Sequence, residues 1–592
     1  MFTKSVATSL LALSSLASHA TAVSKRAWEK RSEHVLLPRN DQGYKTATAP
    51  NNVTIRYKNP GICETTPGVE SYAGYVDLAP NVHIFFWFFE SRRDPASDPV
   101  TLWLNGGPGS DSLIGLFEEN GPCMIDDNFT AVYNPYSWNN VSNMLYISQP
   151  VGVGFSYQAE GEGALRPYTG EFIPNVNDSD TSGVWPVLDP LNRGTIDTTD
   201  LAAVGVWHVL QALFATIPKF DAKIGPVNAS REFNLYTESY GGHYGPTFYR
   251  YFYDQNQKIQ NGSMPGYEVN FNSLGLINAL IDAEVQEDWY PEFAVNNTYG
   301  IKVYNDTVYS YAKFANNMFG GCRYQIGLCR IAAGGNGTYF DPAARITTAD
   351  LLPGVKAICS EAANMCRDNV EGPYYYYGSR GTYDIRHPTD DPTPPGNFAS
   401  YLNDAKVQEA LGVTVNYSST NSAIYYAFQG SGDWIFPNYR LDLEYLLKRD
   451  VRVSLAYGDA DYICDTVGNW FGGQAISLAL EYTHSQQFRA AGYEPLTVDG
   501  TEYGEVRQYG NFSFARIYEA GHEIPYYQPV AALAYFNRTI NHYDIATGQK
   551  PVTANLTSSG PANATHTNSF VPSTSTQSYP FPQPFPTTTP TA

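Results

Sequence analysis

Residues 233–246 read Phe-Asn-Leu-Tyr-Thr-Glu-Ser-Tyr-Gly-Gly-His-Tyr-Gly-Pro. The apolar residues that open this stretch predict a short strand, and the aromatic residues that close it predict a helix. Ser239 stands between them, close to Gly241 and Gly242, which lack a Cβ and allow a sharp turn. Such a turn exposes the serine hydroxyl at the N-terminus of the helix, as in a Gly-x-Ser-x-Gly nucleophile elbow. Thr237 replaces the first glycine of that pattern, so other parts of the chain must decide whether Ser239 is a nucleophile.

Strands and helices alternate on both sides of this elbow. Continuous apolar runs predict strands that are buried on both faces, at 83–89, 100–104, 144–147, 274–277 and 451–457. Residues 198–217 repeat their apolar side chains with a helical period. This order predicts an α/β fold around a parallel or mostly parallel sheet, with core segments at 56–281 and 401–545. Within 401–545, residues 402–411 predict a helix and 516–518 the last strand, whereas 282–400 break the pattern and indicate an insertion.

The two ends of the chain differ in composition from this core. Residues 1–22 contain one lysine, an apolar centre and a small-residue end, which is typical of a secretory signal peptide. Residues 23–55 form a polar leader, a possible propeptide whose basic pairs at 25–26 and 30–31 are either processing sites or a solvated linker. Residues 546–592 are rich in Ser, Thr and Pro and predict a disordered tail. After residue 22 no apolar run approaches the length of a membrane-spanning helix.

Charge and cysteine usage narrow the class of protein. A net charge of −21 argues against nucleic acid or an anionic membrane as a partner, because both need basic faces. We expect no metal and no cofactor. Secretion makes disulfides plausible, and the odd count of seven cysteines leaves one unpaired. Fourteen Asn-x-Ser/Thr sequons predict a glycosylated surface, at Asn52, Asn128, Asn140, Asn177, Asn228, Asn261, Asn296, Asn305, Asn336, Asn416, Asn511, Asn537, Asn555 and Asn563.

A seryl nucleophile needs a base, and the base needs a carboxylate that orients it. Elbow enzymes supply these groups in the order Ser, acid, His, after late strands. His522 follows the last predicted strand, whereas the other late histidines are expected to be solvated, at His484, His542 and His566. The strand at 451–457 is followed by Asp459 and Asp461, and the residues alone leave open which of them orients His522.

A glycine-rich turn at 104–110 directly follows the predicted strand 100–104. Backbone N–H groups in such a turn can stabilise the oxyanion of a tetrahedral intermediate. The alternative, a phosphate-binding loop, requires a Gly-Lys-Ser/Thr ending that this turn lacks.

Five blocks in this order resemble the signature blocks of the serine carboxypeptidases, at 103–109, 149–157, 238–242, 458–464 and 521–522. The resemblance covers roughly residues 60–545. It implies an α/β-hydrolase fold with a helical cap at 282–400, inserted after the strand 274–277. It also implies a catalytic set of Ser239, His522 and Asp461, with oxyanion N–H groups from Gly107 and Tyr240. The chain departs from the family at Thr237, at Ser148, and at 110–112.

The resemblance also implies a site for the free carboxylate of a peptide. Asn105, the Gly106 backbone and two carboxylic acids, Glu119 and Glu238, would hold it by hydrogen bonds. Two facing carboxyl groups cannot both ionise cheaply, so one keeps a proton and can donate it. The residues alone do not exclude Glu118 in place of Glu119.

By the same matching, Cys464 corresponds to a free thiol near the active site, which leaves six cysteines to pair. Six residues separate Cys322 from Cys329 and also Cys359 from Cys366. These equal spacings suggest nested bridges, Cys322 with Cys366 and Cys329 with Cys359, beside a bridge between Cys63 and Cys123.

We therefore expect a secreted serine carboxypeptidase that releases C-terminal residues from peptides and proteins through an acyl-enzyme, most actively in mild acid. Glu523, next to His522, either favours Arg or Lys at the penultimate position or is simply an exposed acid. An acyltransferase or esterase with the same triad is the first alternative. A catalytically silent secreted binding glycoprotein is the second.

Overall fold

The computed structural model describes residues 44–49, 53–166, 172–176, 182–188, 196–334, 351–389, 394–462 and 469–568, except that 221–230 and the side chains of 218–220 are not described. Several sequence predictions lie outside these residues: the signal peptide at 1–22, the leader up to 43, the tail from 569, Cys464, and the sequons at Asn52, Asn177, Asn228 and Asn336.

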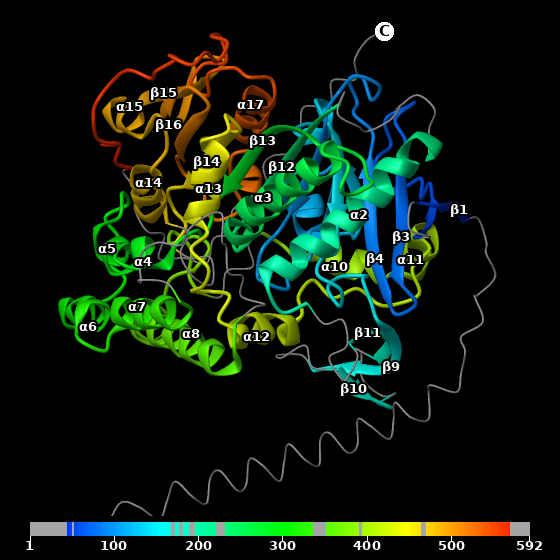
Figure 1. The fold of residues 1–592 in the computed structure, drawn as a ribbon, viewed down its shortest axis with the longest axis horizontal. Helices are drawn as coiled ribbons and strands as arrows, with labels where there is room; N and C mark the ends of the chain where they lie inside the picture. The colour runs from blue at the N-terminus through cyan, green and yellow to red at the C-terminus, as the bar shows by residue number, and fades with distance from the viewer. Residues whose placement is uncertain are drawn as a thin grey trace, which may run out of the picture.

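A single twelve-stranded sheet organises the chain (Figure 1). Its strands are, in spatial order, β1 (Lys45–Thr48), β2 (Thr54–Lys58), β3 (Ser71–Ala79), β4 (Val82–Phe89), β8 (Asn143–Ile147), β5 (Val100–Leu104), β12 (Glu232–Glu238), β13 (Asn270–Ile277), β14 (Arg452–Gly458), β17 (Phe512–Ile517), β16 (Thr501–Tyr509) and β15 (Glu494–Val498). The six central strands, from β8 to β17, are parallel to one another, and the strands on both margins pair antiparallel. The α/β prediction with a parallel central sheet is confirmed.

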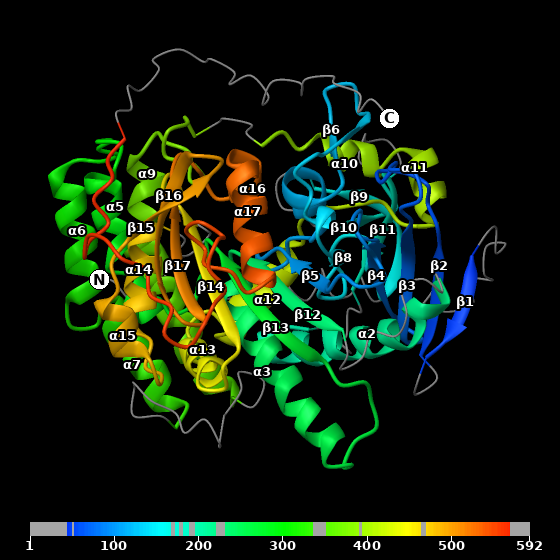
Figure 2. The same ribbon diagram turned by 90° about the horizontal axis from the view of Figure 1, so that it is seen from above.

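The apolar strand runs are explained by burial on both faces of the sheet. In β4, Phe86 and Phe88 belong to one hydrophobic cluster, whereas Phe85 and Trp87 belong to the other. Figure 2 shows α2 (Thr199–Phe220), α3 (Gly241–Gln260) and α13 (Arg440–Leu447) on one face, and α10 (Asn397–Leu402), α11 (Ala405–Leu411) and α17 (Pro529–Ile540) on the other. Side chains alternate between the two faces along a strand, so a strand that is covered by helices on both faces needs apolar residues at successive positions.

Between β13 and β14 the chain leaves the sheet and forms a series of helices. They are α4 (Ala283–Gln286), α5 (Trp289–Asn296), α6 (Asp306–Asn317), α7 (Cys322–Ala332), α8 (Pro353–Cys366), a π-helical turn at Arg367–Glu371, α9 (Gly372–Tyr377), α10, α11, α12 (Ser422–Ser431) and α13. Helices α5 to α8 gather to one side of the sheet (Figure 1), and α9 lies with them (Figure 2).

The remaining elements are short. Two small sheets contain β9 (Ala159–Leu165), β10 (Phe172–Pro174) and β11 (Ser182–Val187), and β6 (Cys123–Ile125) and β7 (Ala131–Tyr133). The other helices are a π-helical turn at Gly115–Asn120, a 3-10 turn at Trp138–Asn140, α14 (Trp470–Ala479), α15 (Ser485–Ala490) and α16 (Ile524–Tyr527).

Three disulfides join Cys63 to Cys123, Cys322 to Cys366, and Cys329 to Cys359. The second and third connect α7 to α8, about two turns apart on each helix, so they hold the two helices side by side. The nested arrangement follows from the antiparallel course of a helical pair.

Three sequence predictions were wrong in part. The helix at 402–411 is two helices, because Asp404 caps the N-terminus of α11 through the backbone N–H of Lys406. The leader does not extend to residue 55, since β1 and the start of β2 belong to the large sheet. The predicted last strand begins earlier, at Phe512.

The predicted disordered tail is wrong for residues 546–568. Ser558 donates to the backbone of Gly492 and accepts from the N–H of Gln508. His566, which was expected to be solvated, stacks on Tyr518 with ring centres 3.7 Å apart. The segment lies over the β15–β16 margin, where its polar groups pair with backbone that a sheet edge leaves open.

Among the described helices, the stretch Thr199–Ile217 of α2 has the length and hydropathy of a membrane span, and 72% of it is buried within the fold.

We predict that the bridge between Cys329 and Cys359 stabilises the α7–α8 pair. Replacing both residues by Ser should lower the melting temperature, since a bridge that closes a loop of this length contributes about 2–5 kcal/mol. Thiol titration of the denatured protein is the control for pairing. The parent should show one thiol and the Cys329→Ser single variant two. An unchanged count in the single variant would contradict the pairing.

Candidate functional site

The elbow at Ser239 links β12 directly to α3. Ser239 has a φ of 70°, a left-handed conformation that costs a non-glycine residue about 1–3 kcal/mol. Two backbone hydrogen bonds hold it, from its N–H to Ile277 O at 3.0 Å and from Leu280 N–H to its carbonyl at 2.9 Å. Gly242 has to be glycine here, because a Cβ would lie 1.9 Å from Leu280 O. The strain at Ser239 is therefore maintained by the end of the neighbouring strand β13 and by the loop that follows it.

Thr237 is compatible with the elbow even though glycine is usual in its place. Its hydroxyl donates to the carbonyl of Gly241 at 2.7 Å. A Cβ at Gly241 would lie 2.6 Å from the Thr237 Cβ, so the glycine at 241 provides the space that the threonine occupies.

The structure brings His522 and Asp461 together at the same edge of the sheet. His522 Nδ1 lies 2.9 Å from Asp461 Oδ2, and both side chains are buried. With Nδ1–H donated to the carboxylate, Nε2 is left as the proton acceptor. Asn278, which the sequence analysis missed, donates through Nδ2 to the same Asp461 oxygen at 2.7 Å.

The choice between the two aspartates is visible in their partners. Asp459 accepts from Arg516 Nη2 at 3.3 Å and from the N–H of Glu519 at 2.8 Å, and it also pairs with Tyr299. It therefore anchors the strand ends, whereas Asp461 is the aspartate that contacts His522.

The glycine turn after β5 packs against the elbow. A Cβ at Gly106 would lie 2.3 Å from the backbone nitrogen of Tyr240 and 2.8 Å from the Ser239 Cβ. Gly107 has a φ of 104°, which also favours glycine. The close approach places the backbone of this turn beside the first turn of α3.

A cavity of about 430 Å³ opens above these groups. It is lined by Asn105, Gly106, Gly107, Pro108, Ser110, Ile114, Glu238, Ser239, Tyr383, Thr420, Asn421, Ser422, Tyr425, Tyr426, His522 and Glu523. The sequence analysis missed the contributions of Tyr383 and of residues 420–426, which come from distant segments. Tyr383 also accepts the N–H of His522 at its carbonyl, at 2.8 Å.

Asn105 connects the two carboxyl groups at the floor of this cavity. Its Nδ2 lies 3.1 Å from both Glu119 Oε1 and Glu238 Oε1. Its Oδ1 accepts from Trp103 Nε1 at 2.8 Å and from Gly115 N–H at 3.0 Å, which fixes the amide orientation. Glu119, and not Glu118, is thus the acid that faces Glu238.

These carboxyl groups hold protons more tightly than ordinary acids. Burial raises the pKa of Glu119 to about 7. Burial, followed by the charge of Glu119, raises the pKa of Glu238 well above its usual value. Since Glu238 Oε1 lies 3.7 Å from His522 Nε2, the pair of carboxyl groups borders the His522 ring.

A second acidic pair lies at the cavity wall. Burial raises the pKa of Glu523 to about 8. The pKa of its neighbour Glu118 is raised well above the usual value, first by burial and then by the charge of Glu523. Glu523 is half-buried, so it is not a simple exposed acid.

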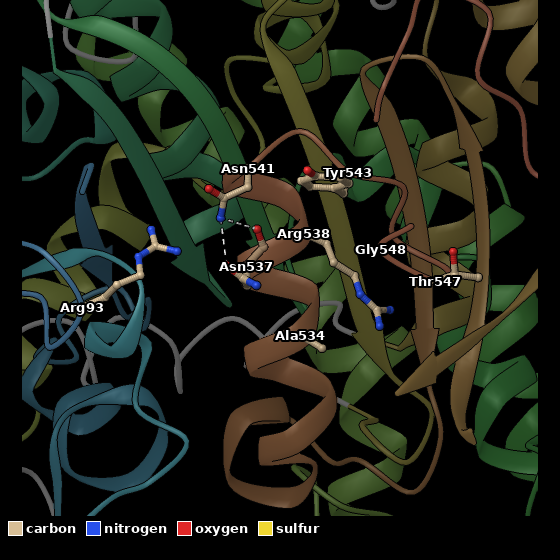
Figure 3. A pocket seen from close by; sticks show the side chains of 8 residues that line it. All are labelled: Arg93, Ala534, Asn537, Arg538, Asn541, Tyr543, Thr547 and Gly548. Atoms are coloured by element: carbon tan, nitrogen blue, oxygen red, sulfur yellow. Dashed lines mark hydrogen bonds between the residues drawn. The ribbon is translucent and has the colours of Figure 1, made fainter. Parts of the chain in front are cut away.

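Another hollow, of about 450 Å³, lies at the end of α17 and contains none of these groups (Figure 3). Its arginines have structural partners, since Arg538 donates to the carbonyls of Ile545, Ala546 and Thr497, and Arg93 pairs with Asp98. Chemistry is therefore assigned to the cavity at Ser239.

Among the described residues, one group has a geometry that could hold a metal ion, Glu287 with Cys322 and Cys366, but the two cysteines form a disulfide.

The described sequon asparagines fall into two groups. Exposed ones are Asn128, Asn261, Asn296, Asn305, Asn555 and Asn563, and partly buried ones are Asn140, Asn416, Asn511 and Asn537.

Comparisons with known proteins agree on one family. Residues 60–542 match the family model described as Serine carboxypeptidase. Carboxypeptidase S1 homolog A of Arthroderma otae is 40% identical over 88% of this chain and 81% of its own. Carboxypeptidase S1 of Penicillium janthinellum is 37% identical over 83% of this chain and 99% of its own.

Among solved structures, the chain is similar to Kex1(delta)p, a prohormone-processing carboxypeptidase from Saccharomyces cerevisiae. The TM-score is 0.57 at 18% identity, with 83% of this chain and 94% of that chain covered. This similarity supports the α/β-hydrolase fold. Together, the family model and the relatives show that the chain belongs to the serine carboxypeptidase family.

Proposed function

We propose that this serine carboxypeptidase acts outside the cell, in mildly acidic solution, on the C-termini of peptides and proteins through an acyl-enzyme. The observation that carries the proposal is the adjacency of two groups. The Asn105–Glu119–Glu238 cluster lies 3.7 Å from His522, measured between Glu238 Oε1 and His522 Nε2. A carboxylate bound at that cluster would place the last peptide bond of a substrate beside Ser239.

In the proposed reaction, Ser239 Oγ forms a bond to the scissile carbonyl carbon while its proton passes to His522 Nε2. Asp461 stabilises the imidazolium through Nδ1–H. The N–H groups of Gly107 and Tyr240 stabilise the oxyanion. Cleavage of the C–N bond releases the amine, which takes the proton from His522. Water then attacks the acyl-enzyme with His522 again as base, which returns the proton to Ser239 and frees the shortened peptide.

The carboxyl pair supplies recognition without a cation. One protonated carboxyl of Glu119 and Glu238 donates a hydrogen bond to the substrate carboxylate, and Asn105 and the Gly106 N–H donate the others. Loss of the shared proton would leave two negative charges facing a third. Binding of the substrate carboxylate should therefore weaken as the pH rises.

Stability also supports an acidic working range. Burial raises the pKa of several carboxyls, to about 6 for Asp433, about 7 for Asp111 and Glu119, and about 8 for Glu287 and Glu523. Folded pKa values above the unfolded ones mean that the folded state binds more protons. The resulting stability is complete below the unfolded values near about 4 and is lost as the pH rises through 6 to 8.

An extracellular location is supported by the predicted signal peptide, the exposed sequons and the three disulfides, which persist in oxidising compartments. Selection of Arg or Lys at the penultimate position of the substrate by Glu523 stays a prediction. Glu523 is protonated below about pH 8, which would weaken such charge pairing in acid.

Replacing Ser239 by Ala should lower the rate of peptide cleavage by about a million-fold, because the triad acts as a unit. Release of C-terminal amino acids from a defined peptide, followed by mass spectrometry, measures this. Ser422→Ala is the matched control, since Ser422 lines the same cavity and has no proposed chemical role. Near-normal release by the Ser239 variant would refute the assignment.

In the parent enzyme, KM for a peptide with a free carboxylate should rise as the pH passes about 7, where Glu119 loses its proton. KM for the corresponding peptide amide should stay level. In the Glu119→Gln, Glu238→Gln double variant, KM for the free peptide should be higher in acid and nearly independent of pH. Steady-state kinetics from pH 4 to 8 test this, with the exposed acid variant Glu409→Gln as control. Equal pH dependence of KM for peptide and amide would show that no shared proton takes part.

A further inference from the structure

Tyr240, whose backbone N–H is proposed to bind the oxyanion, also makes specific contacts through its side chain. The ring is fully buried, and its hydroxyl donates to Asp433 Oδ2 at 2.6 Å. The ring also packs edge-on against Trp434 at 4.9 Å. The residue that follows the nucleophile is thus tied to a segment nearly two hundred residues further along the chain.

Asp433 is itself held by the start of α2. Its Oδ1 accepts from the backbone N–H of Thr199 at 3.0 Å, and its Oδ2 accepts from the Thr199 hydroxyl at 2.6 Å. The N–H groups at a helix N-terminus have no partner within the helix, so an oxygen acceptor is favoured there. Two donors of Thr199, at the start of α2, therefore hold the carboxyl group to which Tyr240 is bonded.

The segment that carries Asp433 is anchored at both ends. At the end of α12, Gly432 has a φ of 86°, and a Cβ there would lie 2.5 Å from the Cβ of Cys359, a disulfide residue of α8. At its start, Asn421 donates its N–H to Gly109 O at 2.8 Å, in the turn that contains Gly107. Helix α12 thus reaches the two backbone segments that form the proposed oxyanion hole.

We propose that Asp433 is a positioning residue for the reaction: its bond to the Tyr240 hydroxyl sets the direction in which the Tyr240 backbone N–H points, and so aligns that donor with the oxyanion. The inference rests on the proposed function of Ser239 and Tyr240. Through Gly432 and Cys359, the same contact links the alignment of the oxyanion hole to the disulfide-bonded helices.

The kinetic consequence is specific. An oxyanion donor acts on charge that develops in the transition state, whereas ground-state binding depends on the Asn105 cluster. Loss of the Tyr240–Asp433 bond should therefore lower kcat by about ten- to a hundred-fold, part of the hundred- to thousand-fold that loss of a whole donor causes, with little change in KM.

The test compares three single variants of the full-length enzyme, two of which replace Tyr by Phe and one of which replaces Asp by Asn. Tyr240→Phe removes only the hydroxyl, and Asp433→Asn changes only the acceptor. Tyr249→Phe is the matched control, because Tyr249 is also buried on α3 and its hydroxyl donates to Phe233 O at 2.7 Å, away from the cavity. For each, we would measure kcat, KM, the melting temperature, and inhibition by an N-blocked peptide aldehyde.

The aldehyde reports on the oxyanion directly. Ser239 Oγ adds to the aldehyde carbon, the carbonyl π pair moves to oxygen, and the serine proton moves to His522. Tyr240→Phe and Asp433→Asn should each weaken aldehyde inhibition by the same factor as kcat, and the double variant should lose no more than either. Tyr249→Phe should lower the melting temperature without weakening aldehyde inhibition.

The inference would be overturned by unchanged aldehyde inhibition in Tyr240→Phe, or by a loss no larger than that of Tyr249→Phe. Additive losses in the double variant would also overturn it, because the two groups would then act separately. Failure of the proposed function is a different outcome, visible in the parent enzyme, which would then neither cleave peptides nor be inhibited by the aldehyde.

Discussion

The left-handed conformation of Ser239 is the constraint on which the rest of the structure depends. A φ of 70° at a non-glycine residue persists only if its surroundings hold it, and here the end of β13 and the loop after it do so through two backbone hydrogen bonds. The same turn leaves no room for side chains at Gly106 or Gly242. The glycines of two separate segments therefore serve one purpose, which is to let three pieces of backbone meet beside one hydroxyl.

Parallel strands bring the remaining groups to this point. β12, β13, β14 and β17 are consecutive neighbours in the sheet, so the loops at their carboxyl ends adjoin one another. Ser239, Asn278, Asp461 and His522 each follow one of these strands. These four residues lie close together because their strands are neighbours in the sheet, although they are far apart in the chain.

Burial of acids gives the site its chemical character. A buried carboxyl keeps its proton to higher pH, because burial disfavours the charged form. Around Ser239 this applies to two pairs, Glu119 with Glu238 and Glu118 with Glu523. The substrate carboxylate can then be met by neutral donors in place of a cation. The acidic working range proposed for this enzyme follows from that arrangement, because the protons that stabilise the fold would also be the protons that the proposed site uses.

Local signals in the sequence were sufficient for the elbow, the doubly buried strands, the order Ser, Asp, His and the α/β fold, because each depends on short-range backbone geometry or on periodic burial. They could not separate Asp459 from Asp461, since both follow the same strand and only Arg516 and His522, on the neighbouring β17 segment, distinguish them. They did not reveal Asn278, Tyr383 or Asp433, which become neighbours of the site only after distant segments pack.

Local signals also failed for residues 546–568, whose polar composition resembles that of a free tail although their hydrogen bonds are made to a sheet margin. Sequence pattern determined which residues could do the chemistry, and tertiary packing decided which of them face one another, because a contact across the sheet leaves no periodic trace in the chain.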